Sequence, residues 1–444
     1  MKNSSIKIEL LAPAGSLEKL KAGFVFGADA VYCGLPDFSL RVRINQFDLD
    51  SLKQGIEHAH SLGKKVYVTV NIFAHNYHLE NLKKYIFELK KIQPDGLIAS
   101  DPGVISLIKE IWPEAEIHLS TQANCTNWQS AKFWYDQGIK RIILAREVTL
   151  DQIKEIHQKV PEVELEYFVH GAMCISYSGR CLLSKYYMDR SGNLGDCVQP
   201  CRWEYKIKSK KQKAKSKKIN EKLEKDETRT IHIEEVKRPG DLLQMQEDEH
   251  GTYIMNSKDL CLIEYLDQLA EAGICSFKIE GRAKSLYYVA NTTKIYREAT
   301  DLIENWDMKK IEQLKNELKK NTNRDFTTGF LFDKEKAEQK YDSGHLPCDW
   351  EFVGVVVKSK KTNEKLKKEK EKQIFVKVHN AIYEGDEVEF VVPKGDNFLI
   401  KIKEIFDADT GERLSEAHGG QDKEILVSID RQVPEYTVLR KKVL

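Results

Sequence analysis

Four cysteines lie within one short stretch of the chain, and their spacing suggests a shared chemical role. The stretch 170–201 reads HGAMCISYSGRCLLSKYYMDRSGNLGDCVQPC, and its cysteines are Cys174, Cys181, Cys197 and Cys201. Four thiolates are the usual ligands of an iron–sulfur cluster. Structural zinc more often uses two tight C-x2–4-C pairs, and only the last pair here is that close. The spacing favours a cluster, with zinc and redox-active or unliganded thiols as alternatives.

Composition restricts the remaining interpretations of these thiols. The chain has 444 residues and nine cysteines, an odd number that cannot all pair in disulfides. Its beginning, MKNSSIKIELLAPAG, contains no apolar signal core, and no apolar run approaches the roughly 20 residues of a membrane span. We therefore expect a cytoplasmic protein without a membrane anchor, in a compartment that disfavours disulfides. The formal net charge of +1 means that any nucleic-acid site is a local patch.

The elements that must position the cysteines follow a regular α/β pattern. Short apolar runs alternate with amphipathic stretches, as in the helix expected over 16–27, with Ser16 as its N-cap. We expect eight strands, over 6–12, 30–34, 65–71, 96–100, 116–122, 141–146, 164–169 and 276–281. Eight such units predict a (β/α)8 TIM-like barrel with a long excursion between the last two strands. A doubly wound open sheet is the alternative, because a sequence pattern does not show closure.

The barrel interpretation predicts where chemistry occurs. Active sites of such barrels lie in the loops that follow the strands. The cysteine stretch begins where the seventh strand ends, so we expect it on the active face. The residues after the other strands include Asn71, Gln122 and the segment 280–282, which reads EGR.

Three further parts of the chain are a lysine-rich insert, a helical linker and a C-terminal region rich in expected strands. Residues 206–225 contain ten lysines within an insert that we place at 206–236, and 358–373 form a similar run. Each run is either a solvated excursion or a contact for a phosphate backbone. From residue 350 the pattern changes to five or six short alternating strands, which predict a small all-β barrel. We expect domains at 1–300 and 350–444, joined by a helical linker at 301–349.

Longer motifs in the chain resemble a known family. The segments EYFVHGAMCISYSGRCLLS and ELLAPAGSLEKLKAGFVFGADAVYCG are similar to the signature of the collagenase-like peptidase family of unassigned catalytic type. GDCVQPCRWEY, NSKDLC, SFKIEGRAKS and WEFVGVVV resemble its prephenate-dependent tRNA uridine 5-hydroxylation branch. The lysine-rich insert departs from this pattern.

The resemblance implies an enzyme of tRNA modification. Its branch makes 5-hydroxyuridine at the wobble position in the anticodon loop of tRNA, without oxygen, using a 4Fe–4S cluster and prephenate as the source of the hydroxyl group. Ligands carried over by motif are Cys174, Cys181 and Cys197. The fourth ligand is expected to be Cys261, because related hydroxylases use a cysteine there, and spacing makes Cys201 the alternative. The electron donor is not indicated.

The implied substrates suggest further site residues. Prephenate carries two carboxylates, which arginine binds in a planar fork, and the candidates at strand ends are Arg41, Arg43, Arg146 and Arg282. Glu280 and His170 are candidate proton carriers. Together with Arg282 they form the expected catalytic set. An unstacked base could rest on Tyr177, Tyr186 or Trp203. For each of these residues, an ion-pair, structural or packing role is the competing interpretation.

Two other functions compete with hydroxylation. The family name suggests a peptidase, which could use Cys174 as nucleophile and His170 as base. The sequence contains neither HExxH nor GxSxG, so the usual signals of a protease are missing. A non-catalytic RNA-binding protein with a structural metal is the second alternative.

Overall fold

The computed structural model describes most of the chain. It covers residues 8–39, 46–174, 176–177, 179–203, 205–207, 229–235, 242–247, 257–332, 348–358, 372–420, 422–429 and 431–443. Most of both lysine-rich runs, together with Arg41 and Arg43, lies outside these residues. Among the described helices, none is both long and apolar enough to cross a lipid bilayer.

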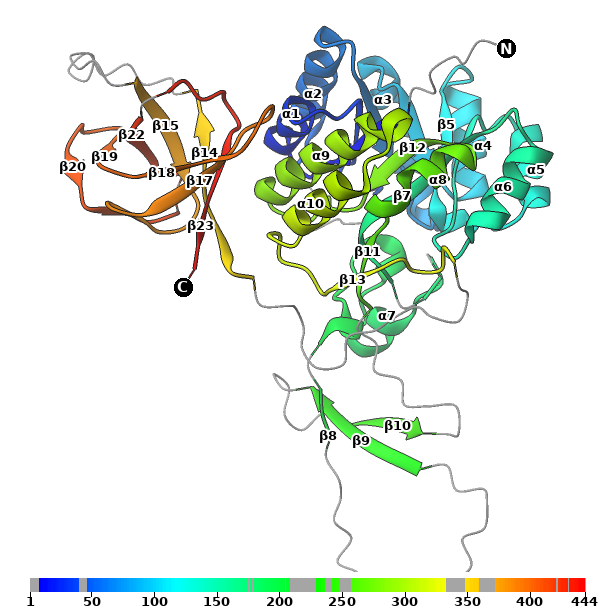
Figure 1. Ribbon diagram of the computed structural model, residues 1–444. Helices are drawn as coiled ribbons and strands as arrows, with labels where there is room; N and C mark the ends of the chain where they lie inside the picture. The colour runs from blue at the N-terminus through cyan, green and yellow to red at the C-terminus, as the bar shows by residue number, and fades with distance from the viewer. Residues whose placement is uncertain are drawn as a thin grey trace, which may run out of the picture.

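Eight parallel strands close into a barrel (Figure 1). In spatial order they run from β12 through β1 to β7, and β7 pairs with β12 to complete the ring. This confirms the predicted (β/α)8 fold and excludes the open sheet. The strands are β1 (Glu9–Pro13), β2 (Ala30–Cys33), β3 (Lys65–Thr69), β4 (Gly96–Ala99), β5 (Ile117–Leu119), β6 (Arg141–Ile143), β7 (Glu164–Ala172) and β12 (Ile274–Ile279).

Helices surround the barrel and bury apolar residues against its strands. In α3, the buried residues Leu82, Ile86 and Leu89 recur at helical spacing and face the strands. Ser16 caps α1 as predicted, with its hydroxyl oxygen accepting from the Lys19 amide. The outer helices are α1 (Leu17–Val25), α2 (Leu49–Ser61), α3 (Leu79–Ile92), α4 (Pro102–Ile111), α5 (Trp128–Asp136), α6 (Leu150–Lys159), α8 (Leu266–Glu271) and α9 (Leu286–Asp301).

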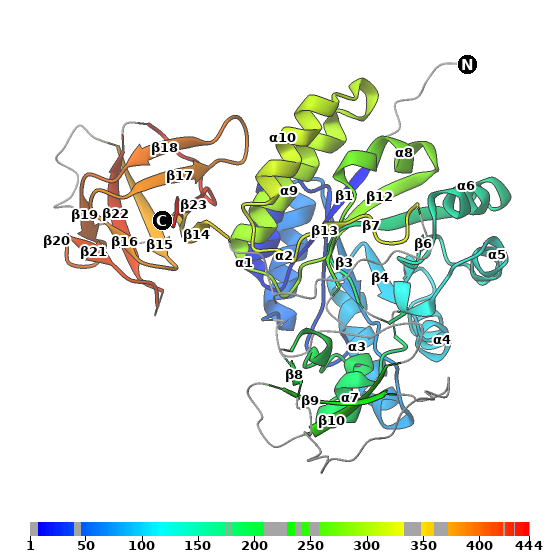
Figure 2. The same cartoon turned by 60° about the horizontal axis from the view of Figure 1, so that its bottom comes forward.

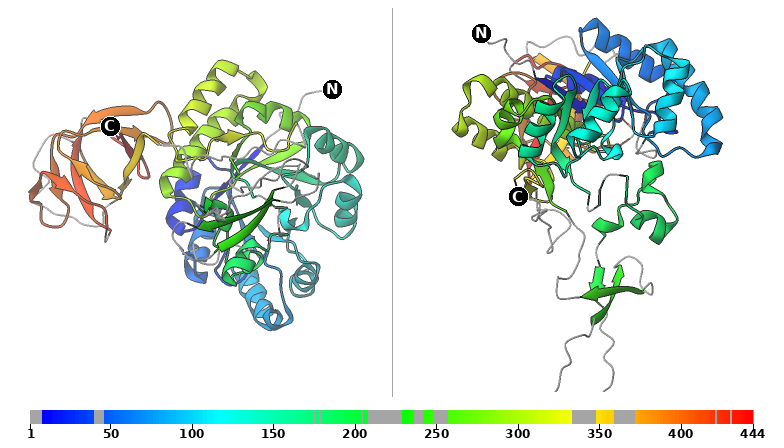
Figure 3. Two further views of the ribbon diagram at one scale, coloured as in Figure 1. Left: turned by 90° about the horizontal axis from the view of Figure 1, so that it is seen from below. Right: turned by 90° about the vertical axis from the view of Figure 1, so that its right-hand side faces the viewer.

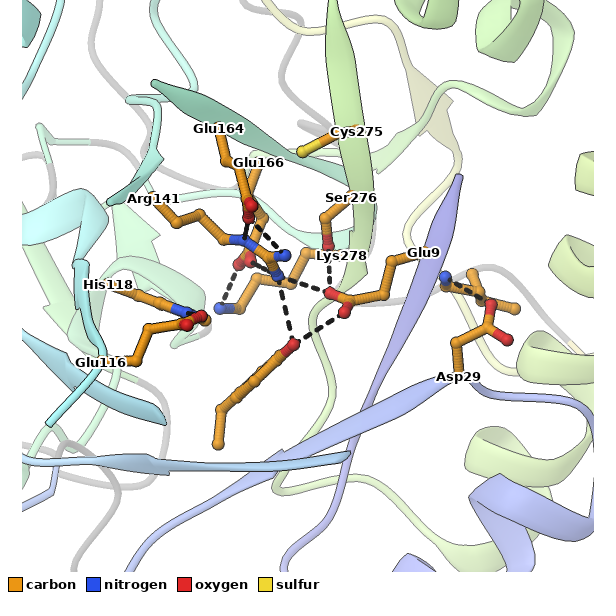
Figure 4. A network of polar contacts seen from close by, with 12 residues as sticks. Glu9, Asp29, Glu116, His118, Arg141, Glu164, Glu166, Cys275, Ser276 and Lys278 are labelled. Carbon is orange, nitrogen blue, oxygen red and sulfur yellow. Dashed lines mark hydrogen bonds and ion pairs between the residues drawn. The ribbon is translucent and has the colours of Figure 1, made fainter. Parts of the chain in front are cut away.

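Charged side chains fill part of the barrel interior (Figure 4). Arg141 on β6 contacts Glu9 on β1 at 2.5 Å and Glu164 on β7 at 2.7 Å. Lys278 on β12 contacts Glu166 on β7 at 2.6 Å, and Glu166 is also 3.5 Å from Arg141. Burial would raise the pKa of Glu166, but Lys278 and Arg141 outweigh that effect and hold it below its ordinary value. The network therefore ties together the strands at which the ring closes.

The excursion between β7 and β12 lies at one end of the barrel. Figure 1 shows α7 (Leu183–Met188) and the β8–β10 sheet at the end opposite the N-terminus. The sheet consists of β8 (Tyr205–Ile207), β9 (Arg229–Glu235) and β10 (Leu242–Glu247). β11 (Asp259–Cys261) then pairs antiparallel with the end of β7, and β13 (Phe326–Thr327) pairs with β11. Short 3-10 turns are η1 (Asn76–His78), η2 (Thr121–Ala123), η3 (Gly192–Leu194), η4 (Pro200–Arg202), η5 (Ile263–Tyr265) and η6 (Ile303–Asn305).

The last hundred residues form an all-β unit, as predicted. After α10 (Met308–Leu318), eight strands make one antiparallel sheet with the shape of a half-barrel, beside α1 and α9 (Figure 2). This is more strands than the five or six expected, because the apolar run 398–406 divides into two strands and the strands at 413–414 and 438–442 were not recognised. The strands of this unit are β14 (Trp350–Val357), β15 (Lys372–Val378), β16 (Ile382–Tyr383), β17 (Glu387–Val391), β18 (Phe398–Lys401), β19 (Ile405–Asp407), β20 (Arg413–Leu414), β21 (Glu416–Ala417), β22 (Glu424–Ile429) and β23 (Val438–Lys442), of which β16 and β21 pair separately.

A buried arginine joins the half-barrel to the barrel. Arg440 on β23 is fully buried and donates to Glu389 at 2.6 Å and to the Tyr287 hydroxyl of α9 at 2.8 Å. It also pairs with Glu317 of α10. An apolar cluster that includes Phe26 surrounds these contacts. The half-barrel is therefore fixed against the outer helices.

The barrel network predicts a large effect of a single substitution. Arg141→Met leaves Glu9 and Glu166 without their guanidinium partner inside the barrel, and breaking a buried pair in this way costs about 3–5 kcal/mol. We expect denaturant unfolding to show a loss of that size. The exposed pair Lys132–Asp136 provides the control, since Lys132→Met should leave the unfolding midpoint unchanged. Equal midpoints for Arg141→Met and the wild type would contradict a stabilising role of the network.

Candidate functional site

A cavity of about 140 Å³ opens at the carboxyl ends of the strands. Its wall combines residues of β2, β3, β4, β6, β7 and β12, and of the segment 120–122 that follows β5, with residues of the cysteine segment 172–201. The view from below in Figure 3 looks onto this end of the barrel, where α7 and β9 lie. The cysteine stretch therefore lies at the carboxyl ends of the strands, where the sequence analysis placed it.

Four cysteines line the cavity: Cys174, Cys181, Cys197 and Cys201. Cys174 is exposed and the other three are partly buried. The segment that carries them packs against the loop after β3, where the Phe73 amide donates to the Asn193 carbonyl at 3.2 Å. Gly179 has φ +74°, and a side chain there would meet the Phe73 ring. Local backbone contacts thus hold the cysteine segment over the barrel mouth.

The donor set of this wall suits an iron–sulfur cluster, which needs four thiolates. Within the described residues, no three His, Cys, Asp or Glu side chains already converge on one point as metal ligands do. The ligand assignment therefore depends on the observation that all four cysteines line one cavity.

Cys261 lies apart from these four thiols. It is buried on β11, and its sulfur is 3.8 Å from the Tyr296 hydroxyl. It does not line the cavity. Burial raises the pKa of its thiol to about 11. The positions therefore favour Cys201 over Cys261 as the fourth ligand.

Three cationic side chains form the deep wall of the cavity. They are Arg146 after β6, Lys278 on β12 and Arg282 just after β12. Arg282 donates to the hydroxyl oxygens of Ser39 and Thr69 at 2.9 and 2.8 Å. Burial lowers the pKa of Lys278, against the raising effect of its partner Glu166. The sequence analysis named Arg146 and Arg282 but missed Lys278, whose signal is a lysine inside an otherwise apolar strand.

Arg146 lacks part of its normal complement of hydrogen bonds. The residue is only 9% exposed, and its guanidinium lies over the Phe168 ring at 3.8 Å from the ring centre. Its ion contact with Glu280 is long, at 3.8 Å, and its Nε has no hydrogen-bond acceptor among the residues that the structure describes. A buried N–H without an acceptor is costly, and arginine binds carboxylates through paired N–H groups. This wall is therefore suited to an anionic ligand.

Glu280 is held at the cavity by its backbone and side chain. Its amide donates to the His170 carbonyl, and its own carbonyl accepts from the Tyr288 hydroxyl, each at 2.9 Å. The Tyr32 hydroxyl is 3.4 Å from its carboxylate. Gly171 permits this packing, because it has φ +108° and any side chain there would strike the Glu280 carbonyl. Glu280 is thus placed to exchange a proton with a bound molecule.

His170 is near these residues in sequence but does not line the cavity. Its Nδ1 is 3.3 Å from the Tyr296 hydroxyl, and its ring packs against Tyr288 and Phe326. Burial lowers its pKa to about 4, although Asp259 opposes that shift. The imidazole is therefore neutral at neutral pH. This position suits a structural role better than proton transfer, and it does not pair His170 with Cys174 as a peptidase dyad would require.

Polar and aromatic residues complete the cavity. The Asn71 amide donates to the Ser120 hydroxyl at 3.2 Å and to the Gln122 side-chain oxygen at 3.1 Å. The sequence placed Asn71 and Gln122 after strands without assigning them a role. Tyr177 lines the cavity and is 54% exposed. Tyr186 lies on the cysteine segment and Trp203 just after it, both outside the cavity wall, and the Trp203 indole donates to the Val198 carbonyl at 3.1 Å.

Fold and cavity together define a (β/α)8-barrel protein with a ligand site rich in cysteine and cationic residues. The chain belongs to peptidase family U32: the model of that family matches residues 15–341, and the model of the family's C-terminal domain matches 349–440.

Relatives of the chain carry several different names. It is 42% identical to tRNA hydroxylation protein P of Escherichia coli over 421 residues, which are 89% of this chain and 88% of that protein. It is 36% identical to the 23S rRNA 5-hydroxycytidine C2501 synthase of E. coli, over 68% of this chain and 40% of that enzyme. It is 32% identical to a collagenase of Porphyromonas gingivalis, over 76% of this chain and 77% of that protein.

Thiol reactivity should separate the cavity cysteines from the buried ones. Thiolates are the species that alkylating reagents attack. Burial raises the pKa of Cys33 and Cys125 to about 12. In metal-free protein at pH 8, we expect iodoacetamide to label Cys174, Cys181, Cys197 and Cys201 at least ten times faster than Cys33, Cys125 and Cys261, as about 1% or less of a thiol with such a pKa is ionised. Peptide mass spectrometry measures the rates, and labelling of Cys261 as fast as Cys174 would contradict the described burial.

Proposed function

We propose that this protein is a tRNA hydroxylase that adds a hydroxyl group to C5 of the wobble uridine without using dioxygen. The observation that carries the proposal is one cavity whose wall contains four thiols and the incompletely bonded guanidinium of Arg146. A thiol-rich wall suits a redox centre, and a buried cationic wall suits a small acid. The tRNA and rRNA hydroxylation named for two relatives supports the substrate class.

We assign a 4Fe–4S cluster to Cys174, Cys181, Cys197 and Cys201, with Cys261 as the competing fourth ligand. When bound, such a cluster supplies electron transfer. Backbone contacts of the cysteine segment would then help to fix its position, since the loop after β3 contacts this segment at Gly179 and Asn193.

The hydroxyl source is proposed to be prephenate, a dicarboxylate. Arg146 and Arg282 would each hold one carboxylate through paired N–H groups, and Lys278 would add a third positive charge. Glu280 would accept or return a proton at its Oε2, the oxygen nearest to Arg146. The exposed ring of Tyr177 at the cavity would receive the target base.

Deletion of the gene tests the substrate. We expect tRNA from the deletion strain to lack 5-hydroxyuridine and its derivatives, and a plasmid copy of the wild-type gene to restore them. Nucleoside mass spectrometry is the measurement. Persistence of these nucleosides in a strain with no second hydroxylation pathway would contradict the proposed function.

Metal analysis of cysteine variants tests the cluster. Wild-type protein purified without oxygen should contain iron and sulfide, and Cys174→Ser, Cys181→Ser, Cys197→Ser and Cys201→Ser should each lose most of the iron. Cys125→Ser and Cys261→Ser are the controls that should retain it. Loss of iron from Cys261→Ser, with retention by Cys201→Ser, would transfer the fourth position to Cys261. A colourless wild-type protein with one zinc per chain would contradict the cluster.

A substitution at Arg146 tests the anion site. Removing a charge-assisted hydrogen bond costs about 1.5–3 kcal/mol, so Arg146→Gln should raise the KM for prephenate by roughly tenfold or more. Arg413→Gln is the control, since Arg413 is an exposed arginine of the half-barrel. An unchanged KM in Arg146→Gln would show that the acid binds elsewhere.

A further inference from the structure

Exposed aromatic rings gather on two segments next to the cavity. On η1, Tyr77 is 71% exposed, and its ring is parallel to that of His75, with an angle of 5° and 5.6 Å between ring centres. On the cysteine segment, Tyr177 is 54% exposed and Tyr186 is 80% exposed. We call these four side chains the rim aromatics. Single exposed aromatic residues are common on protein surfaces, but a set of them beside one cavity is not.

The two segments belong to one surface because they are in contact. Asn71 lines the cavity, and η1 begins five residues later. Between them, Phe73 bonds to Asn193 and packs against Gly179, both of which line the cavity. The rim aromatics therefore extend from the cavity wall onto the outer surface of the barrel.

The rings are supported by neighbours and are thus ready to bind. The Tyr77 ring also contacts His78, with 4.0 Å between ring centres, and the His75 amide donates to Nδ1 of His78 at 2.9 Å. Tyr186 lies against Tyr187, with ring centres 5.1 Å apart. Rings held in this way lose little conformational freedom when a flat partner stacks on them.

From these contacts we infer that the rim aromatics form a stacking platform for the unpaired bases of a single-stranded RNA loop, with the target base at Tyr177 and its flanking bases on the other rings. This inference rests on the proposed function and names where the RNA lies. Every base has a flat π-face, so stacking on Tyr and His recognises single-stranded RNA without reading its sequence. The exposed Arg180, in the same segment as Tyr177, supplies a positive charge for the backbone phosphates.

A duplex does not fit this surface equally well, because its bases are stacked on one another and offer no free faces. The platform should therefore distinguish a loop from a helix. The cavity beside it, with the Asn71 and Gln122 amides in its wall, is then left for the one base that enters.

Binding measurements on the full chain test the platform. The probes are a fluorescent anticodon stem–loop RNA and a blunt, fully paired RNA of equal length, followed by anisotropy. Tyr77→Ala and Tyr186→Ala should each weaken binding of the stem–loop by roughly five- to a hundredfold, as expected for loss of one stacked base, and leave binding of the duplex unchanged. Tyr77→Phe keeps the ring and should bind like the wild type.

Phe133→Ala is the matched control, because Phe133 is a 56% exposed aromatic residue on α5 and does not line the cavity. It should not change either affinity. Wild-type affinity for the stem–loop in both Tyr77→Ala and Tyr186→Ala would overturn the platform. If the wild type nevertheless hydroxylates tRNA, the proposed function stands and only the place of the RNA is wrong. If the wild type neither binds nor hydroxylates tRNA, the proposed function and the platform fail together.

Discussion

Compensation of buried charge is the constraint on which the barrel depends. Glu166 is fully buried, so its carboxylate requires positive partners close by, and Lys278 and Arg141 provide them from β12 and β6. These three residues come from the strands at which the ring closes. The ion pairs therefore link β7, where the ring closes, to its neighbours β12 and β6. A set of apolar side chains would fill the same space but would not select its partners in this way.

The same constraint reaches the candidate site through Lys278. Its ammonium is both a partner of Glu166 and part of the cavity wall, together with Arg146 and Arg282. The buried charges that stabilise the barrel are thus continuous with the charges that line the cavity. Lys278 lies on a strand and Arg146 and Arg282 follow strands closely, whereas the thiols are carried on the cysteine segment above them. Under the proposed function, this division would hold a small acid at defined positions while the cysteine segment receives an inorganic centre.

Much of the fold could be predicted from the sequence, because alternating apolar runs mark each strand and its following helix. Strand ends were less certain: β5 has three residues, although the apolar pattern extends over seven. The cysteines were singled out by their spacing, and Arg146, Glu280 and Arg282 because they follow strands. Lys278 and Glu166 were not, since their pairing joins residues 112 positions apart in the chain. His170 was expected at the site, but the strand register shifts between Phe168 and His170, which breaks the alternation and directs only Phe168 to the cavity.

Closure of the ring by direct pairing of β7 with β12 has a consequence for how the protein matures. The cysteine-bearing stretch 173–201 contributes no strand to the ring. Formation of the barrel and its helices therefore does not require the proposed cluster, so a folded chain would be the species that receives inorganic sulfide and iron. Under the proposed function, loss of the cluster under oxidising conditions would leave an inactive but folded protein, which could be reloaded rather than resynthesised.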